Sequence, residues 1–175
     1  MRIKNDFYRT PPAVTAALAQ AIPPIVLQNL IYSRGVVDPC AGDGALLDAL
    51  DALGVFAFGL DIEPQREDIA ARDALDGAPW GSPFAVPSAT IMNPPFALAD
   101  RFIRRALDET PYFVCALLRL TFLEPTRNRR DLLELRPDAL ILAKRPRFRT
   151  DTRGTDSATC AWFTWPGTGQ WRVQQ

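Results

Sequence analysis

The sequence predicts an α/β fold built on one doubly wound, largely parallel sheet of seven strands. Short apolar runs of strand length alternate along the chain with helical patterns, which is the order that a parallel sheet with crossover helices requires. The chain's 16 prolines and 10 glycines fit short connections between these elements. With 47% hydrophobic residues among 175, the chain can bury one full core. We therefore expect residues 1–175 to form a single domain.

The first predicted element is a helix near the amino terminus. Its apolar face is formed by Val14, Leu18 and Ile22. We expect Thr10 to act as its N-cap and Pro11 to take the first helical position, where a missing N–H costs nothing. A capped surface helix is one interpretation of this segment, and for Arg9 it is the one we favour.

A glycine-containing turn follows the first predicted strand and reads Asp38-Pro-Cys-Ala-Gly-Asp-Gly44. Gly42 and Gly44 can adopt positive φ and bring backbone N–H groups to a ligand at the start of a helix over 45–53. The spacing is not the Gly-x-Gly-x-x-Gly of dinucleotide sites, and the carboxylate of Asp43 would repel a phosphate. Because carboxylates tolerate a sulfonium, the turn favours S-adenosylmethionine as its ligand. An ordinary tight strand-to-helix turn is the alternative.

The second and third predicted strands each end in an acidic residue. The second strand, 55–60, leads into Asp61, which lies where the ribose diol of a nucleotide-type cofactor is held, and Ile62 would face the adenine. The third strand, 68–73, ends in Asp73, a candidate for contact with the cofactor. A turn-capping role is the alternative for Asp73.

A rigid polar and aromatic tetrapeptide, Asn93-Pro94-Pro95-Phe96, follows the predicted strand 89–92. The prolines hold the loop open, so the Asn93 carboxamide oxygen and the Pro94 carbonyl can accept both hydrogens of one exocyclic amino group. Accepting both hydrogens localises the nitrogen lone pair and makes the amine a better nucleophile. Phe96 offers a flat apolar face for a planar substrate. Taken alone, the tetrapeptide would read as a strand-end turn with a buried Phe.

The remaining elements complete the alternation. The seven expected strands are 35–37, 55–60, 68–73, 89–92, 112–118, 138–143 and 157–165. Further helices are expected over 97–109 and 125–135. The connection 64–67 is too short for a crossover helix, so this part of the chain departs from the usual strand-helix-strand unit of a parallel sheet. The loop 145–157 lies outside the carboxyl end of a strand, where ligands bind in such sheets.

The formal net charge of zero conceals an asymmetry between the two parts of the chain. Residues 1–92 carry six basic and eleven acidic side chains, whereas residues 119–175 carry eleven basic and six acidic ones. The candidate nucleic-acid-binding residues in the basic part are Arg127, Arg129, Arg130, Arg147, Phe148, Arg149 and Arg153. The arginines would contact phosphates and Phe148 would stack a base. For any one of these arginines, the alternative is a solvated surface charge without a phosphate contact.

Composition argues against several other functions. Cys40, Cys115 and Cys160 stand singly and the chain has no histidine, so zinc chemistry, histidine general-base catalysis and serine triads are poorly supported, and no metal is expected. No apolar stretch approaches the length of a membrane span, and the amino terminus lacks the apolar core of a signal peptide. We expect a soluble cytoplasmic protein without a membrane partner.

The glycine turn and the Asn-Pro-Pro-Phe tetrapeptide together resemble the S-adenosylmethionine-dependent amino-group methyltransferases, most closely the small phage-type adenine-N6 DNA methyltransferases. The resemblance implies a Rossmann-like class I methyltransferase fold whose last strand inserts antiparallel. It also implies that an amino-terminal Thr-Pro element closes over the methionine end of the cofactor. The implied cofactor-binding set is Phe7, Tyr8, Thr10, Pro11, Asp38, Pro39, Cys40, Ala41, Gly42, Asp43, Gly44, Asp61, Ile62 and Asp73.

The activity that the resemblance implies is methyl transfer to N6 of adenine in DNA. Asn93, Pro94, Pro95 and Phe96 would clamp an adenine flipped out of the duplex. The interval after Phe96 is filled by elements of the core sheet, so we expect no separate target-recognition domain and little sequence specificity. Relatives methylate adenine in ribosomal or transfer RNA, and others methylate glutamine side chains of proteins. RNA and a non-catalytic cofactor-binding subunit remain the alternatives.

Overall fold

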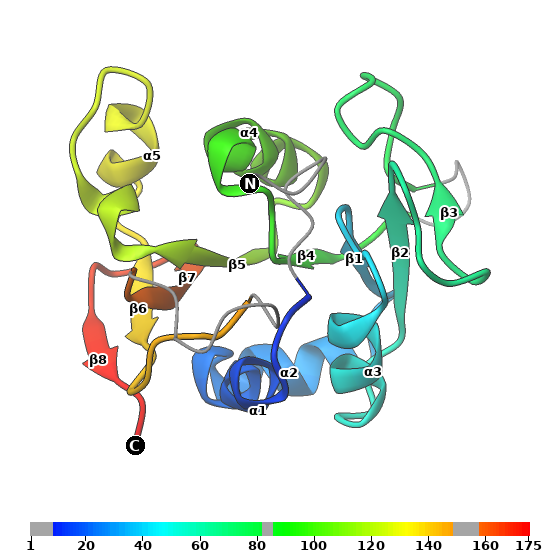
Figure 1. The fold of residues 1–175 in the computed structure, drawn as a ribbon, viewed down its shortest axis with the longest axis horizontal. Helices are drawn as coiled ribbons and strands as arrows, with labels where there is room; N and C mark the ends of the chain where they lie inside the picture. Colours follow the sequence, from blue (N-terminus) through cyan, green and yellow to red (C-terminus); the bar gives the residue numbers. More distant parts are fainter. Residues whose placement is uncertain (1–8, 82–85, 149–157) are drawn as a thin grey trace.

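The computed structural model describes residues 9–81, 86–148 and 158–175 (Figure 1). In this part of the chain one sheet has the strand order β3-β2-β1-β4-β5-β7-β6-β8. Its strands are β1 (Val36–Asp38), β2 (Ala57–Asp61), β3 (Ala70–Ala71), β4 (Ala89–Met92), β5 (Phe113–Arg119), β6 (Asp138–Ile141), β7 (Cys160–Trp165) and β8 (Trp171–Val173). The helices are α1 (Pro12–Ala21), α2 (Pro24–Ile31), α3 (Ala45–Asp51), η2 (Phe96–Leu98), α4 (Ala99–Glu109), η3 (Leu120–Leu123) and α5 (Arg130–Glu134).

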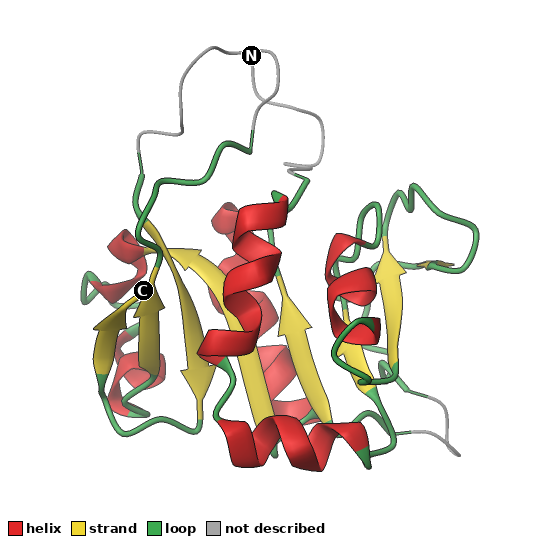
Figure 2. Ribbon diagram, turned by 90° about the horizontal axis from the view of Figure 1, so that it is seen from below, coloured by secondary structure: helices red, strands yellow, loops and turns green. Residues whose placement is uncertain are grey.

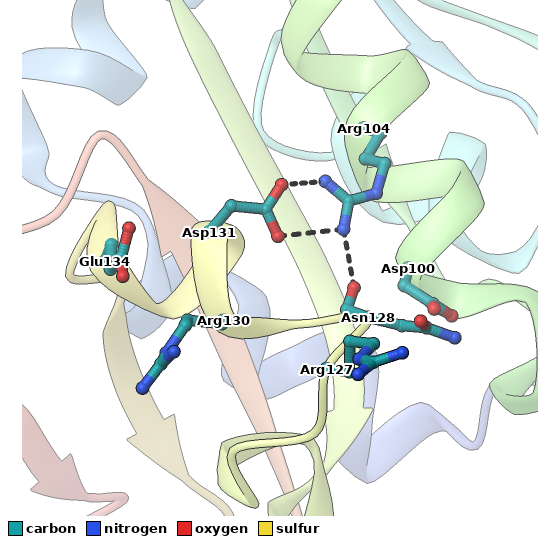
Figure 3. A pocket seen from close by; sticks show the side chains of 7 residues that line it. All are labelled: Asp100, Arg104, Arg127, Asn128, Arg130, Asp131 and Glu134. Carbon is teal, nitrogen blue, oxygen red and sulfur yellow. Dashed lines mark hydrogen bonds and ion pairs between the residues drawn. The ribbon is translucent and has the colours of Figure 1, made fainter.

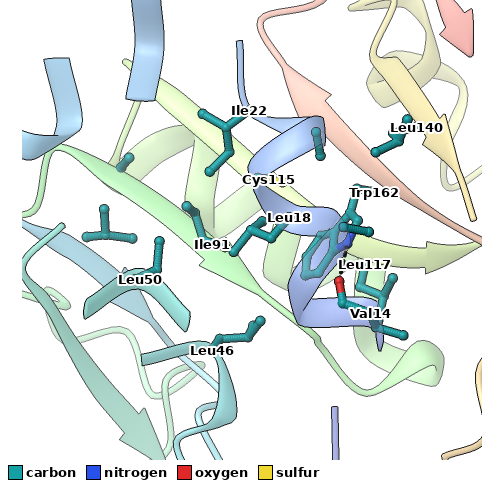
Figure 4. Close-up of a cluster of buried hydrophobic side chains, with 14 of the residues drawn as sticks. Val14, Leu18, Ile22, Leu46, Leu50, Ile91, Cys115, Leu117, Leu140 and Trp162 are labelled. Carbon is teal, nitrogen blue, oxygen red and sulfur yellow. Dashed lines mark hydrogen bonds between the residues drawn. The ribbon is translucent and has the colours of Figure 1, made fainter. Parts of the chain in front are cut away.

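The helices cover both faces of the sheet. Figure 1 shows α1, α2 and α3 on one face and α4 and α5 on the other. Because side chains alternate along a strand, Ile91 enters the core beneath α1 whereas Met92 enters the core beneath α4. Figure 4 shows the first core, in which the indole N–H of Trp162 donates to the carbonyl oxygen of Val14 at 3.1 Å. Each face of the central strands is therefore buried.

The strand directions confirm the predicted doubly wound architecture. β1, β2, β3, β4 and β5 run parallel, and β7 inserts antiparallel between β5 and β6. Figure 2 shows the arrowheads of parallel strands at the same edge of the sheet. The predicted number of seven strands is wrong by one, because β8 pairs in parallel with β6 at the edge. Its three residues are all exposed, so no apolar run marks it in the sequence.

Several predicted helix boundaries differ from the structure. Thr10 is not the N-cap of α1: Pro11 is, it makes no side-chain cap bond, and the first helical residue is Pro12. The helix α2 was not predicted, because its Pro23-Pro24 start reads as a break although proline fits the first helical turn well. Residues 125–126 have no regular structure and residues 127–129 form a turn, so α5 is much shorter than the predicted helix 125–135.

Residues 62–81, which follow β2, are mostly irregular. β3 has only two residues of the predicted 68–73 strand, and both are exposed. Residues 62–69, which join β2 to β3, contain no helix, as the short connection predicts. The carboxyl end of β2 is therefore bordered by loop rather than by a crossover helix.

Among the described helices, none is by itself long and apolar enough to cross a membrane. By length and composition α1 and α2 would satisfy that test together, but they are bent by 101° where they meet.

Candidate functional site

The carboxyl edge of the parallel strands gathers the polar motifs of the sequence. β1 ends in Asp38, β2 ends in Asp61, and Asn93 directly follows β4. β1 lies between β2 and β4 in the sheet, so these three residues start adjacent loops. This edge is the usual position of a ligand site in an open α/β sheet.

The glycine turn after β1 is built around two residues with left-handed backbone. Gly42 has φ of 55° and Gly44 has φ of 80°, values that favour glycine. The N–H of Ala41 donates to the carbonyl oxygen of Leu60 at 2.9 Å, which ties the turn to β2. Gly44 is the N-cap of α3, so the turn delivers the chain to the start of that helix as predicted.

The loop after β2 packs closely over the glycine turn. The N–H of Gln65 donates to the carbonyl oxygen of Gly42 at 2.9 Å. A Cβ placed on Gly44 would lie 2.4 Å from the guanidinium of Arg66, so this side chain would have to move to admit a larger residue there. Arg66 in turn forms ion pairs with Asp48 and Asp68, both at 2.6 Å. The loop and the turn therefore form one packed unit.

Asp61 connects the two motifs through its carboxylate. One oxygen accepts the N–H of Gly42 at 2.8 Å and the other accepts the N–H of Glu63 at 2.8 Å. The adjacent Ile62 is 57% exposed, an unusual position for a large aliphatic side chain beside a polar turn. Asp73 is exposed and accepts the N–H of Leu75 at 2.8 Å, which is the turn-capping geometry given above as its alternative.

Asp38 is a buried carboxyl at the base of the site. It is 1% exposed and accepts the backbone N–H of Cys40 at 3.1 Å. Burial raises the pKa of Asp38 to about 7, although the hydrogen bonds from Cys40 oppose the rise. A cation bound nearby would favour its ionised form.

The thiol of Cys40 lies between Asp38 and the Asn93 loop. Burial and the carboxylates of Asp38 and Asp61 raise the pKa of Cys40 well above its ordinary value, and a backbone hydrogen bond from Asn93 opposes this. The thiol therefore stays protonated and is a poor nucleophile. Its contact with Asn93 brings the glycine turn and the tetrapeptide together.

The segment before α1 joins the site. The Asn93 Nδ2–H donates to Oγ1 of Thr10 at 3.0 Å, and Thr10 is buried. Arg9 Nε pairs with the carboxylate of Asp43 at 2.6 Å. The surface interpretation of Arg9 is therefore wrong in part: the side chain is exposed, but it contacts the glycine turn. Phe7 and Tyr8 lie outside the described residues, as do Arg149 and Arg153.

Phe96 contacts a buried aromatic residue and an exposed cation. Phe148 packs against it with ring centroids 5.8 Å apart and planes at 70°. Phe148 is itself buried in the core beneath α1, so it is not placed to stack a nucleic-acid base as predicted. The guanidinium carbon of Arg119 lies over the Phe96 ring, 4.5 Å from its centroid. Sequence reasoning missed Arg119, although its position at the end of the buried strand β5 is a usable signal.

The predicted basic cluster is only partly brought together. Arg127 and Arg130 line a shallow pocket with Asp100, Arg104, Asn128, Asp131 and Glu134. Figure 3 shows Arg104 joined to Asp131 by two contacts and to the carbonyl oxygen of Asn128. The pocket thus contains as many acidic as basic side chains.

The other two described arginines of that set lie elsewhere. Arg129 is outside this pocket, donates to the carbonyl oxygen of Thr121 at 3.1 Å and lies over Phe122. Arg147 is exposed.

No protein-family model and no curated protein sequence matches the chain. Its structure is similar to that of a candidate RNA methyltransferase from Pyrococcus horikoshii, with a TM-score of 0.63 and 16% identity over 91% of this chain and 86% of that one. It is also similar to a type I restriction-modification methyltransferase subunit from Streptococcus thermophilus, with a TM-score of 0.60 and 15% identity over 90% of this chain and 44% of that one.

A candidate class I S-adenosylmethionine-dependent methyltransferase from Listeria monocytogenes is a third similar structure, with a TM-score of 0.59 and 14% identity. That comparison covers 94% of this chain and 61% of the other. The chain therefore spans less than two thirds of two of these three proteins. At such low identity the similarity shows the fold, which is that of the class I methyltransferases.

Proposed function

We propose that this protein transfers a methyl group from S-adenosylmethionine to the exocyclic N6 amine of adenine in DNA. The observation that carries the proposal is the position of Asn93-Pro-Pro-Phe96. The tetrapeptide starts at the carboxyl end of β4, beside the glycine turn, and Thr10 fixes the orientation of the Asn93 carboxamide. The class I methyltransferase fold and the Asn-Pro-Pro-Phe tetrapeptide thus both support methyl transfer to an amine.

The residues around the glycine turn fit S-adenosylmethionine. Asp38 and Asp43 place acidic oxygens at the turn, which suits a sulfonium and an ammonium better than phosphates. Asp61 would hold the ribose hydroxyls, and the exposed Ile62 would cover the adenine. When bound, S-adenosylmethionine supplies an electrophilic methyl group. The residues around the glycine turn would orient that methyl group.

The tetrapeptide would bind and activate the target amine. The Asn93 carboxamide oxygen and the Pro94 carbonyl accept the two N–H groups of the amine, which localises its lone pair. Phe96 stacks the flipped base. Attack on a sulfonium methyl needs in-line positioning more than proton transfer, so the fixed carboxamide is the main contribution of the protein.

DNA is the preferred substrate class, and RNA is the second candidate. The described elements after Phe96 belong to the core sheet or pack on it, so the recognition surface that they offer is small. We therefore propose methylation in a very short sequence context, with activity that falls steeply as salt rises because phosphate contacts dominate. One structurally similar protein is described as a candidate RNA methyltransferase, which makes RNA a necessary comparison.

The test compares the wild-type protein with Asn93→Ala. Calorimetry should show one site for S-adenosylmethionine in both proteins. Turnover of the variant should fall by two to three orders of magnitude, or about 3 to 4 kcal/mol, as for loss of a preorganised polar group. Mass spectrometry of nucleosides after reaction with plasmid DNA or total RNA identifies the product, and sequencing of modified bases on the plasmid gives the context.

The outcomes of this test are separable. A variant that methylates at nearly the wild-type rate overturns the role of Asn93. A wild-type protein that binds the cofactor but modifies neither polymer overturns the proposed function and favours the alternative of a non-catalytic cofactor-binding subunit. Confinement of the product to one motif of about four or more base pairs would show a larger recognition surface than the described residues contain.

A further inference from the structure

Arg119 has a position that the proposed chemistry leaves unexplained. It is the last residue of β5, at the same edge of the sheet as Asn93, and its side chain is exposed. Its guanidinium carbon lies 4.5 Å from the centroid of the Phe96 ring. Among the described residues it forms no ion pair. A charged group at the substrate face of the site thus contacts an aromatic ring and no carboxylate.

Phe148 and Arg119, which both contact Phe96, differ in burial. Phe148 is buried and packs against Phe96, whereas Arg119 is exposed and its guanidinium lies over the Phe96 ring. A planar base approaching from solvent would need the surface that the guanidinium now covers. At 4.5 Å the guanidinium and a stacked base cannot share that surface.

We propose that Arg119 is a nucleic-acid-positioning residue: it covers Phe96 in the free protein and binds a backbone phosphate beside the target base when the base takes its place. This inference rests on the proposed function. An exposed cation–π contact is weak, so a stacking base can displace the guanidinium. The displaced charge then lies next to the nucleotide that displaced it, and arginine matches the geometry of a phosphate.

The test measures how salt affects DNA binding. The probe is a fluorescein-labelled duplex of mixed sequence, with S-adenosylhomocysteine present, and a single-stranded RNA of the same sequence forms a second arm. Arg119→Gln should make the slope of log K against log salt shallower by about 0.9 on the duplex and by about 0.7 on the single strand. Arg119→Lys should keep the wild-type slope because it keeps the charge.

Arg34→Gln is the matched control, since Arg34 is exposed and lies just before the amino end of β1, at the opposite edge of the sheet. It should leave the slope unchanged. In the methylation assay Arg119→Gln should raise KM for the nucleic acid about 5- to 10-fold with kcat within about twofold, as for loss of uniform binding.

Equal slopes for Arg119→Gln and the wild type overturn the inference. An Arg119→Gln variant that no longer binds S-adenosylhomocysteine also overturns the inference, because Arg119 would then have a structural role. A wild-type protein that methylates neither DNA nor RNA overturns the proposed function instead, and the two failures are distinct because the binding slopes need no turnover.

Discussion

The side-chain amide nitrogen of Asn93 donates a hydrogen bond to the hydroxyl of Thr10 at 3.0 Å, across 83 residues of sequence. A carboxamide held through its nitrogen has its oxygen turned to the other side. The bond therefore selects one of the two orientations that the Asn93 amide could adopt. Because Arg9 also pairs with Asp43, the segment before α1 contacts both motifs of the site.

Thr10→Val should lower turnover about tenfold, or about 1.4 kcal/mol, because the Asn93 amide loses the partner that orients it. Affinity for S-adenosylmethionine should stay within about twofold, since the Thr10 hydroxyl faces Asn93. Steady-state methylation and calorimetry check the two quantities. Thr15→Val is the control, because the Thr15 hydroxyl donates to the Pro12 carbonyl oxygen within the first turn of α1. Equal losses of affinity and turnover in Thr10→Val would make Thr10 a cofactor ligand instead.

Asp61→Asn should weaken binding of S-adenosylmethionine and of S-adenosylhomocysteine, each by about tenfold or more. The carboxamide offers one accepting oxygen where the carboxylate offers two, so Gly42 or Glu63 loses its acceptor. The free energy of unfolding should fall by about 1 to 2 kcal/mol for the same reason. Calorimetry and urea unfolding measure both effects. Asp68→Asn, a change in an exposed ion pair with Arg66, should leave cofactor affinity unchanged.

Stability should depend on pH through Asp38. Its pKa is raised to about 7 in the folded protein, so the neutral form is favoured by folding. Its contribution is fully present below the ordinary carboxyl pKa near 4 and is lost as pH rises through about 7. The loss is on the order of 4 kcal/mol. Urea unfolding at about pH 5 and about pH 8 should show a smaller decrease for Asp38→Asn than for the wild type. Parallel decreases in the two proteins would contradict this.

Gly44→Ala should cost more stability than Gly54→Ala. Both glycines have left-handed backbone, with φ of 80° and 74°, so each substitution should cost about 1 to 2 kcal/mol in strain. A Cβ at Gly54 meets nothing within 4 Å, whereas a Cβ at Gly44 meets the Arg66 guanidinium. Thermal unfolding measures the difference between the variants. Only Gly44→Ala should also weaken cofactor binding, and equal behaviour in both assays would show that the Arg66 contact is unimportant.

The fold was largely predictable because most of its elements carry local patterns. The buried strands β4, β5 and β7 are apolar runs, and the glycine turn marks the passage from β1 to α3. β8 was missed because its exposed residues are ordered by pairing with β6, which a local pattern cannot reveal. The helix α2 was missed because its two prolines are as typical of a break as of a helix start.

The candidate site was predictable at the level of motifs but not of contacts. The glycine turn, Asp61 and the Asn93 tetrapeptide lie together because parallel strands end at one edge. The N-cap prediction for Thr10 failed because a bond to Asn93 took the place of the local cap. The prediction for Phe148 failed because burial of its ring outweighs the polarity of its arginine-rich surroundings. Both contacts join distant segments, so neighbouring residues give no sign of them.

The insertion of β7 between β5 and β6 has a consequence for synthesis of the protein. β5 is a seven-residue strand that is buried except at Arg119, and among the described strands its edge away from β4 pairs with β7, residues 160–165. While the chain emerges from the ribosome, that edge stays unpaired until Trp165 has been made, long after β5 itself is complete. An open apolar edge of this kind invites pairing with another nascent chain. The yield of folded protein in a cell should therefore depend on the rate at which residues 120–165 are translated.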